Sequence, residues 1–307
     1  MHPFRFAVHQ GWASSGERWA ALARRVESIG YDVLVMPDHL GNQLSPFAAL
    51  SAAAAATTRL RVGAFVFAND YRHPLMLARE AATLDLLSGG RFEMGLGAGW
   101  MTGDYRRLGM PYDPPAKRID RLQEAIPLIK RLLTGETVTH TGEHYRLEKA
   151  SVGVEPVQKP RPPLAIGGGG PRMLRLAARE AEIVGLTAGF DAHGRVRIRQ
   201  ATETATVEKI GWIREAAGDR FERLEINLWL GGAGLVGSGN SLLESVAAAA
   251  RWAPTAVYGS PYVLYGTLAS TREQLLRRRD RLGVSYYTVP SHAMESMAPL
   301  VEALAGK

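Results

Sequence analysis

Short apolar segments of strand type alternate with helical segments along the whole chain. The helical segment 17–29, for example, carries Trp19, Val26 and Ile29 at the spacing of one buried helix face. The eight expected strands are residues 4–9, 33–36, 60–67, 91–96, 163–166, 183–186, 224–230 and 284–289. Eight such alternations in a chain of 307 residues predict a (β/α)8 TIM barrel in one domain, residues 1–307. A doubly wound open sheet shares this alternation and is the alternative fold.

Two features of the sequence bear on the protein's location in the cell and on the chemistry open to it. The sequence has no cysteine, which excludes disulfides and thiolate nucleophiles. Its longest apolar stretch, residues 47–56, is rich in alanine and too short to cross a bilayer, and no signal peptide is recognisable. We therefore expect a soluble, cytoplasmic protein without a membrane partner. Residues 135–163 interrupt the alternation and are expected to form an insertion over the barrel mouth.

The net charge of +7 raises the question of a nucleic-acid partner. The basic residues form only small groups, such as Arg24-Arg25 and Arg277-Arg278-Arg279, within helical patterns that also contain glutamate and leucine. Diffuse basicity without interleaved aromatic residues is typical of a solvated surface. We expect a small-molecule substrate and no nucleic-acid binding.

The segment V-L-V-M-P-D-H-L-G, residues 33–41, joins an apolar strand to two polar side chains. Pro37 ends the strand, and Asp38 and His39 follow it directly. In a (β/α)8 barrel the working residues lie at the carboxyl ends of the strands, so both are candidates for the site. An imidazole can donate or accept a proton near neutral pH, which favours an acid–base function for His39.

Glycines dominate two other strand ends. The fourth strand runs into G-L-G-A-G-W, which places Gly97, Ala98 and Gly99 at the mouth, and the fifth ends in Gly167 to Gly170 before Pro171. Glycines ahead of a helix let backbone N–H groups converge on a phosphate, so the second run is the best anion site. The alternative is that these glycines only permit a tight turn.

Two further motifs are weaker. G-A-G-L-V-G at residues 232–237 matches the dinucleotide fingerprint but lacks an acidic residue about 20 positions on, so we expect a glycine-rich loop. His140 and His144 stand four apart around Gly142, which favours a surface hairpin over a metal site. No metal site is expected.

Three segments together carry a family resemblance. They are D-H after the second strand, G-A-F-V-F after the third, and the block from His73 to Trp100, H-P-L-M-L-A-R-E-A-A-T-L-D-L-L-S-G-G-R-F-E-M-G-L-G-A-G-W. In these the chain resembles the bacterial luciferase-like superfamily of flavin- and F420-dependent oxidoreductases. Within it the sequence is most similar to the F420-dependent oxidoreductases of actinobacterial type.

The resemblance implies a cofactor ring in the barrel mouth and a homodimer. It implies a cis peptide at Phe65-Val66 or an adjacent bond behind the ring, and His39 as proton donor or acceptor. The cofactor, F420 or alternatively FMN, would have its phosphate on the glycine run. The cofactor-binding residues would be Asp38, His39, Phe65, Val66, Gly97, Ala98, Gly99, Gly167, Gly168, Gly169, Gly170, Pro171 and Thr187.

The chain also departs from one branch of the superfamily. Trp100 stands where the F420-dependent glucose-6-phosphate dehydrogenases carry a glutamate, and no tryptophan lies near Gln43. A fairly apolar organic substrate is therefore expected, in a pocket that includes His9, Trp12 and Trp100. The implied reaction is hydride transfer between C5 of the deazaflavin and that substrate. The alternatives are an FMN-dependent monooxygenase that uses O2 and a non-catalytic binding protein.

Overall fold

The computed structural model describes residues 1–191, 196–235 and 259–307. Its strands are β1 (Arg5–His9), β2 (Val33–Met36), β3 (Arg61–Ala64), β4 (Phe67–Ala68), β5 (Phe92–Gly97), β6 (Val138–Thr141), β7 (Arg146–Ala150), β8 (Leu164–Gly168), β9 (Ile183–Leu186), β10 (Glu225–Trp229), β11 (Gly232–Leu235), β12 (Val263–Gly266) and β13 (Val284–Pro290). Its α-helices are α1 (Gly16–Ile29), α2 (Pro46–Ala55), α3 (Pro74–Leu87), α4 (Thr102–Leu108), α5 (Pro115–Leu133), α6 (Pro171–Glu180), α7 (Glu203–Ala217), α10 (Leu268–Leu282) and α11 (Met294–Leu304). Short 3-10 turns are η1 (Asn69–Tyr71), η2 (Ile198–Gln200), η3 (Gly218–Arg223) and η4 (Ser291–Ala293).

The main sheet of the described residues has the strand order β3-β2-β1-β13-β10-β9-β8-β5-β4, and β3 also pairs with β5. The sheet therefore closes on itself. Strands β3 and β4 are two parts of one predicted strand, so the closed sheet has the eight parallel strands of a (β/α)8 barrel. The predicted fold class is confirmed, and the open doubly wound alternative is wrong.

The chain divides into two compact units. The first contains residues 1–10, 25–34 and 167–307, and the second contains residues 11–24 and 35–166. Strands β2 and β8 each pass from one unit into the other. The prediction of a single domain stays a prediction.

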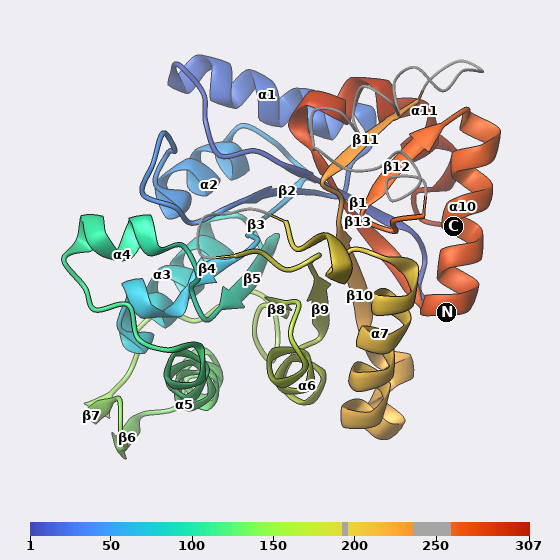
Figure 1. Ribbon diagram of the computed structural model, residues 1–307. Coiled ribbons are helices and arrows are strands. Elements are labelled where there is room, and N and C mark those ends of the chain that lie inside the picture. The colour runs from blue at the N-terminus through green and yellow to red at the C-terminus, as the bar shows by residue number, and fades with distance from the viewer. Residues whose placement is uncertain (192–195, 236–258) are drawn as a thin grey trace. The chain divides into compact units, whose positions relative to one another are not determined.

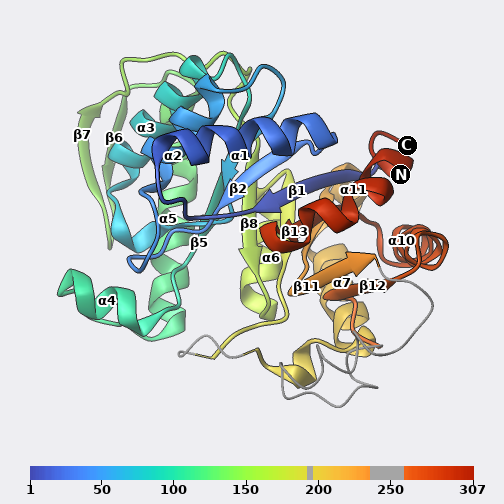
Figure 2. The same ribbon diagram turned by 90° about the horizontal axis from the view of Figure 1, so that it is seen from above.

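The first unit is built on four parallel strands, in the order β1, β13, β10, β9. Phe6 of β1 and Tyr287 of β13 stack with ring centroids 6.2 Å apart. Of the helices in this unit, α7 packs on α6, and α10 packs on β13 and on β12, which pairs with β11 (Figures 1 and 2). Burial of apolar residues on the strands supplies the core that holds these helices.

The second unit contains β3, β4, β5 and the start of β8, with α3 packed on α5 (Figure 1). Phe47 of α2 stacks on Phe67 of β4 at 4.4 Å between centroids. Strands β6 and β7 form an antiparallel hairpin beside α5, in the segment predicted to be an insertion. His140 lies in this hairpin, as predicted, with its Nε2 atom 3.0 Å from Oε1 of Glu124.

Most predicted elements occur where the sequence places them, and two differences stand out among the described residues. The sequence pattern also predicts a helix over 196–217, but α7 begins only at Glu203, because the Thr202 side chain accepts a hydrogen bond from Ala205 N and caps the helix there. The glycine-rich loop expected at 232–237 is wrong for Gly232 to Leu235, which form β11 and pair with β12. A helix expected at 241–252 lies outside the described residues.

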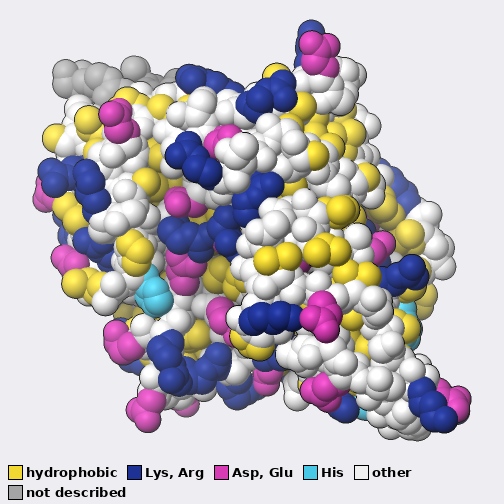
Figure 3. Space-filling model, turned by 180° about the vertical axis from the view of Figure 1, so that it is seen from behind, with side chains coloured by type: hydrophobic (Ala, Val, Ile, Leu, Met, Phe, Trp, Pro, Cys, Tyr) yellow, Lys and Arg dark blue, Asp and Glu magenta, His cyan; other side chains and the backbone are white. Residues whose placement is uncertain are grey.

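Charged side chains are mixed on the surface. On the face shown in Figure 3, Lys and Arg side chains lie among acidic and hydrophobic ones. In the part of the chain that the structure describes, no helix is long and apolar enough to cross a membrane.

Candidate functional site

In the second unit, His39 is paired with a buried aspartate. The Nδ1 atom of His39 lies 2.7 Å from Oδ2 of Asp104, which is the third residue of α4. The Asp104 side chain is fully buried, whereas that of His39 is 27% exposed. A carboxylate only accepts hydrogen bonds, so Nδ1 carries the proton of this bond and Nε2 is left as the atom that can hold or release another.

Asp104 is held by more than its bond to His39. Its Oδ1 atom accepts hydrogen bonds from Leu40 N at 3.1 Å and from an Arg107 guanidinium nitrogen at 3.2 Å. The Tyr71 hydroxyl donates to Oδ2 at 3.4 Å. These four donors give a buried carboxylate the partners that it needs, and they fix the orientation of the imidazole.

Two aromatic side chains adjoin this pair. The indole of Trp100 meets the imidazole of His39 edge to face, with centroids 5.4 Å apart. Burial, together with the charge of Asp104, raises the pKa of Tyr71 far above its ordinary value. Tyr71 therefore remains a neutral hydrogen-bond donor at physiological pH. His39 and Trp100, which were predicted as catalytic and substrate-pocket residues, are thus neighbours.

Asp38, predicted to contact the cofactor, is engaged by protein groups through both oxygens. The Arg72 guanidinium binds it in bidentate fashion, with one nitrogen 3.1 Å from Oδ1 and another on Oδ2. Ala68 N donates to Oδ2 at 3.0 Å. Asp38 therefore ties the end of β2 to β4, and its contact with a cofactor stays a prediction.

The predicted cis peptide is confirmed at Phe65-Val66. Glycines of β5 lie directly against this segment. A Cβ atom on Gly95 would overlap the carbonyl oxygen of Ala64, and one on Gly97 would lie 2.5 Å from Val66 Cγ2. At position 95 only glycine permits this close approach of two backbones, and at position 97 only glycine leaves room for the Val66 side chain.

The loop that carries Trp100 and α4 is anchored from α5. Arg118 is buried and donates to the carbonyl oxygens of Gly99 and Asp113. Gly99 has φ +72°, and a Cβ there would meet the Tyr105 hydroxyl, which itself donates to Asp70 at 2.8 Å. The loop is therefore fixed by buried hydrogen bonds.

In the first unit, the four glycines run from the end of β8 to the N-cap of α6. Gly170 is the N-cap of α6 and Pro171 its first residue. Thr187, just past β9, donates its backbone N–H to the carbonyl of Gly168 at 3.1 Å. A Cβ on Gly169 would lie 3.0 Å from the Thr187 carbonyl oxygen and 3.2 Å from Gly189 N. The structure thus brings the predicted glycine run and Thr187 together.

The remaining predicted pocket residues lie in different surroundings. His9, at the end of β1, packs edge to face on Trp229 at 6.1 Å, and Trp229 also meets Phe190 at 5.8 Å. Trp12, in the second unit, is 53% exposed. Its place in a substrate pocket stays a prediction.

Sequence reasoning missed Asp104 and Trp229. Trp229 ends a predicted strand, so the rule that named His9 could have named it as well. Asp104 lies on a short helix that was not predicted, and the only signal was an acidic residue shortly after G-A-G-W.

The fold and the site define a class of protein that comparison with known families identifies. A family model described as luciferase-like monooxygenase matches residues 1–284. The chain belongs to this family. The resemblance inferred from the sequence is therefore confirmed.

Curated relatives match part of the chain. An F420-dependent glucose-6-phosphate dehydrogenase of Microbacterium testaceum is 35% identical over 54% of this chain and 51% of its own length. A 4-hydroxyprotoasukamycin monooxygenase of Streptomyces nodosus subsp. asukaensis is 36% identical over 52% of this chain and 43% of its own. The chain thus spans about half the length of the curated relatives it matches.

Solved structures match over nearly the full length. A coenzyme F420 dependent tetrahydromethanopterin reductase from Methanopyrus kandleri has a TM-score of 0.78 at 19% identity, covering 98% of this chain and 99% of its own. A long-chain alkane monooxygenase has a TM-score of 0.77 at 15% identity, covering 99% and 91%. At these identities the likeness shows the fold.

Proposed function

We propose that this chain is an F420-dependent oxidoreductase that transfers a hydride between the deazaflavin and a small, fairly apolar organic substrate. The observation that carries the proposal is the His39–Asp104 pair, which leaves one imidazole nitrogen available for a proton beside an indole ring. The names of two relatives, F420-dependent glucose-6-phosphate dehydrogenases at 35% and 34% identity, support the choice of cofactor.

The residues at the strand ends of the second unit fit a flat ring. Phe65, Val66, Ala98 and Trp100 are each half-buried, whereas the strands that precede them are buried. Position 97 is a glycine, so β5 lies close against Val66. Residue 97 therefore places no side chain over the cis peptide. These are the residues that we assign to the ring. The glycine run of the first unit is assigned, on its own geometry, to the phosphate.

The bound deazaflavin would supply the hydride chemistry at C5. The chain supplies orientation and the matching proton. Asp104 holds the His39 ring so that Nε2 can give a proton to, or take one from, the substrate atom whose charge changes. Trp100 lies against the same imidazole and provides an apolar wall that favours a substrate with little charge.

An FMN-dependent monooxygenase is the second candidate. The relative named as a monooxygenase, 36% identical, supports it as directly as the dehydrogenases support the first. Both cofactors carry a flat tricyclic ring and a phosphate, so the same residues could hold either one. The absence of the dehydrogenase glutamate at Trp100 is compatible with both candidates.

Titration of the purified protein with F420 and with FMN tests the choice of cofactor. We expect F420 to bind at micromolar concentrations and FMN at least tenfold more weakly. Micromolar binding of FMN without binding of F420 would overturn the proposal in favour of the monooxygenase. Binding of neither would overturn both.

Replacement of the histidine tests the catalytic assignment. His39→Ala should lower kcat by about 100-fold or more, since a general acid–base group contributes about 10²- to 10⁴-fold. Glu136→Gln, which changes an exposed side chain, serves as the control. Unchanged turnover in His39→Ala would contradict the catalytic assignment.

The homodimer is also part of the proposal. Sedimentation of the wild-type protein tests it.

A further inference from the structure

Lys209 of α7 is a buried lysine whose hydrogen-bond partners, among the residues that the structure describes, are three neutral oxygens. The residue is 2% exposed, and its Nζ atom lies 2.8 Å from the carbonyl oxygens of Thr187 and Gln200 and 3.1 Å from the Tyr262 hydroxyl. Among the described residues no carboxylate lies within ion-pair distance of it. Lysine is almost never buried without a charged partner, because an uncompensated charge is expensive to remove from water. Burial lowers the pKa of Lys209 to about 8.

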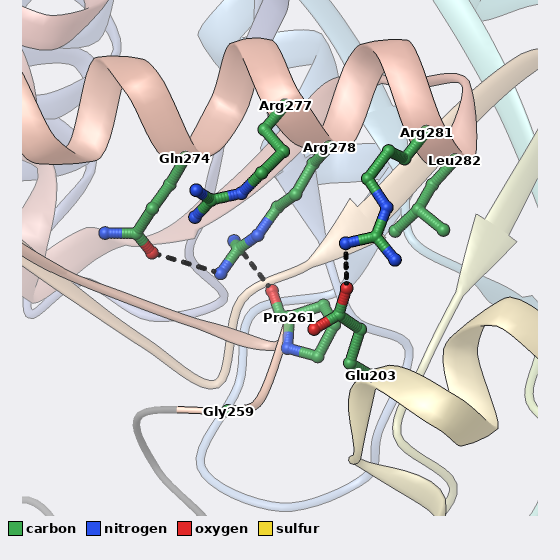
Figure 4. A pocket seen from close by; sticks show the side chains of 8 residues that line it. All are labelled: Glu203, Gly259, Pro261, Gln274, Arg277, Arg278, Arg281 and Leu282. Carbon is green, nitrogen blue, oxygen red and sulfur yellow. Dashed lines mark hydrogen bonds and ion pairs between the residues drawn. The ribbon is translucent and has the colours of Figure 1, made fainter.

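The three acceptors belong to three separate segments. Thr187 follows β9, Gln200 ends η2, and Tyr262 precedes β12. The segment that contains Tyr262 is also bound by α10, because Arg278 of that helix donates a hydrogen bond to the carbonyl oxygen of Pro261 (Figure 4). A lysine ammonium has three N–H donors, and here each has an acceptor. Lys209 therefore joins three segments at one point.

Thr187 connects this point to the glycine run. Its N–H donates to Gly168, and its carbonyl oxygen lies 3.0 Å from the place where a Cβ on Gly169 would be. That carbonyl carries partial negative charge, which alone would repel an anion held by the glycines. The ammonium on the same oxygen offsets this charge, and because Lys209 is buried its charge is less screened by water than that of a surface lysine.

We propose that Lys209 is a positioning residue for oxyanion binding at Gly167 to Gly170, where it fixes Thr187 and adds its positive charge to the attraction for a phosphate group. The proposal rests on the function proposed above, in which this run holds the cofactor phosphate. It goes further because it makes the affinity of the glycine run for an oxyanion depend on Lys209, which lies on α7. The competing explanation is that Lys209 only stabilises the fold.

The test uses inorganic phosphate and F420 as separate probes of the full chain. Lys209→Met removes the charge and keeps the length of the side chain. We expect the dissociation constants of both probes, measured by isothermal titration, to rise at least tenfold. If Lys209→Met does not fold, Lys209→Gln carries the same expectation, because it is neutral but retains two N–H donors.

Two matched variants separate the charge from its surroundings. Tyr262→Phe removes one acceptor at the same place and leaves the ammonium on Thr187. Arg214→Met removes a positive charge from the exposed side of the same helix, where Arg214 lies over the Phe221 ring at 4.5 Å. We expect both variants to bind phosphate within twofold of the wild-type protein.

Each outcome decides the proposal. It is overturned if the wild-type protein does not bind phosphate, if Lys209→Met binds it normally, or if Tyr262→Phe loses as much affinity as Lys209→Met. Phosphate binding that depends on Lys209 without any binding of F420 would support the proposal and defeat the proposed cofactor. Loss of both affinities only in the Lys209 variants would support both.

Discussion

His39 and Asp104 are 65 positions apart in the sequence, yet their Nδ1 and Oδ2 atoms lie 2.7 Å apart. The contact joins the end of β2 to the first turn of α4. It turns an imidazole at a strand end, which could be merely structural, into one with a fixed ring and a defined free nitrogen. A base oriented by a carboxylate is a recurrent arrangement in enzymes that move protons.

Asp104→Asn should lower kcat by about 100-fold while the affinity for cofactor changes less than threefold. The amide of asparagine can present its NH2 group to Nδ1, which would favour the wrong tautomer of His39. Steady-state kinetics and a cofactor titration on the same preparation measure the two quantities. A fall in cofactor affinity as large as the fall in kcat would contradict this prediction and assign Asp104 to the stability of the loop.

Gly95→Ala should destabilise the protein by about 1–3 kcal/mol, because the new Cβ would overlap the backbone carbonyl of Ala64. Gly103→Ala in α4 is the matched control. Its Cβ would come no closer than 3.6 Å, to an Arg107 nitrogen, so we expect no loss of stability. Thermal and urea unfolding measure both variants, and equal midpoints for the two would refute the prediction.

Arg72→Met should cost about 3–5 kcal/mol of stability, because it leaves the buried Asp38 carboxylate without its cation. The exposed pair of Arg25 and Glu295, with side chains 53% and 55% exposed, provides the comparison. Arg25→Met should leave the unfolding midpoint unchanged. A small effect in Arg72→Met would show that Asp38 is accessible to solvent, and it would reopen the prediction that Asp38 contacts the cofactor.

Lys209 should make the free energy of unfolding rise with pH between about 8 and 10.5. Its pKa is lowered by burial from the ordinary value of 10.5 to about 8, so in this range the unfolded chain binds the proton and the folded chain does not. Each unit of difference between the two pKa values is worth about 1.4 kcal/mol. The difference in unfolding free energy between the wild-type protein and Lys209→Met should therefore increase over this range. A difference that is constant with pH would contradict the lowered pKa.

Local patterns predicted the elements of the fold well. Strands β2 and β9 have the predicted bounds, because a short apolar run is a local signal, and Pro37 marks the end of β2. The elements that differ from the prediction also have physical explanations. One expected strand is divided into β3 and β4 at the cis peptide, and the glycines of β11 form a strand because β12 pairs with them.

The candidate site was predicted in part. Strand ends can be read from the sequence, and they gave His39, the glycine runs and Thr187. The partners of these residues could not be read in the same way. Asp104 and Lys209 lie on helices and reach the strand ends only through the packing of those helices, which depends on contacts far apart in the sequence.

The sequence by itself determined the alternation of strands and helices and the position of His39 at a strand end, while the pairing of β3 with β5 in the tertiary structure decided for the barrel over the open sheet. The alternation and the strand end follow from the hydrophobic period and from proline and glycine, which act over a few residues. Only the tertiary structure decided what each polar group binds. In the tertiary structure Asp38 pairs with Arg72, His39 with Asp104, and Thr187 with Lys209. A buried charged group needs a partner, and the packing of segments far apart in the sequence determines which partner is within hydrogen-bond distance.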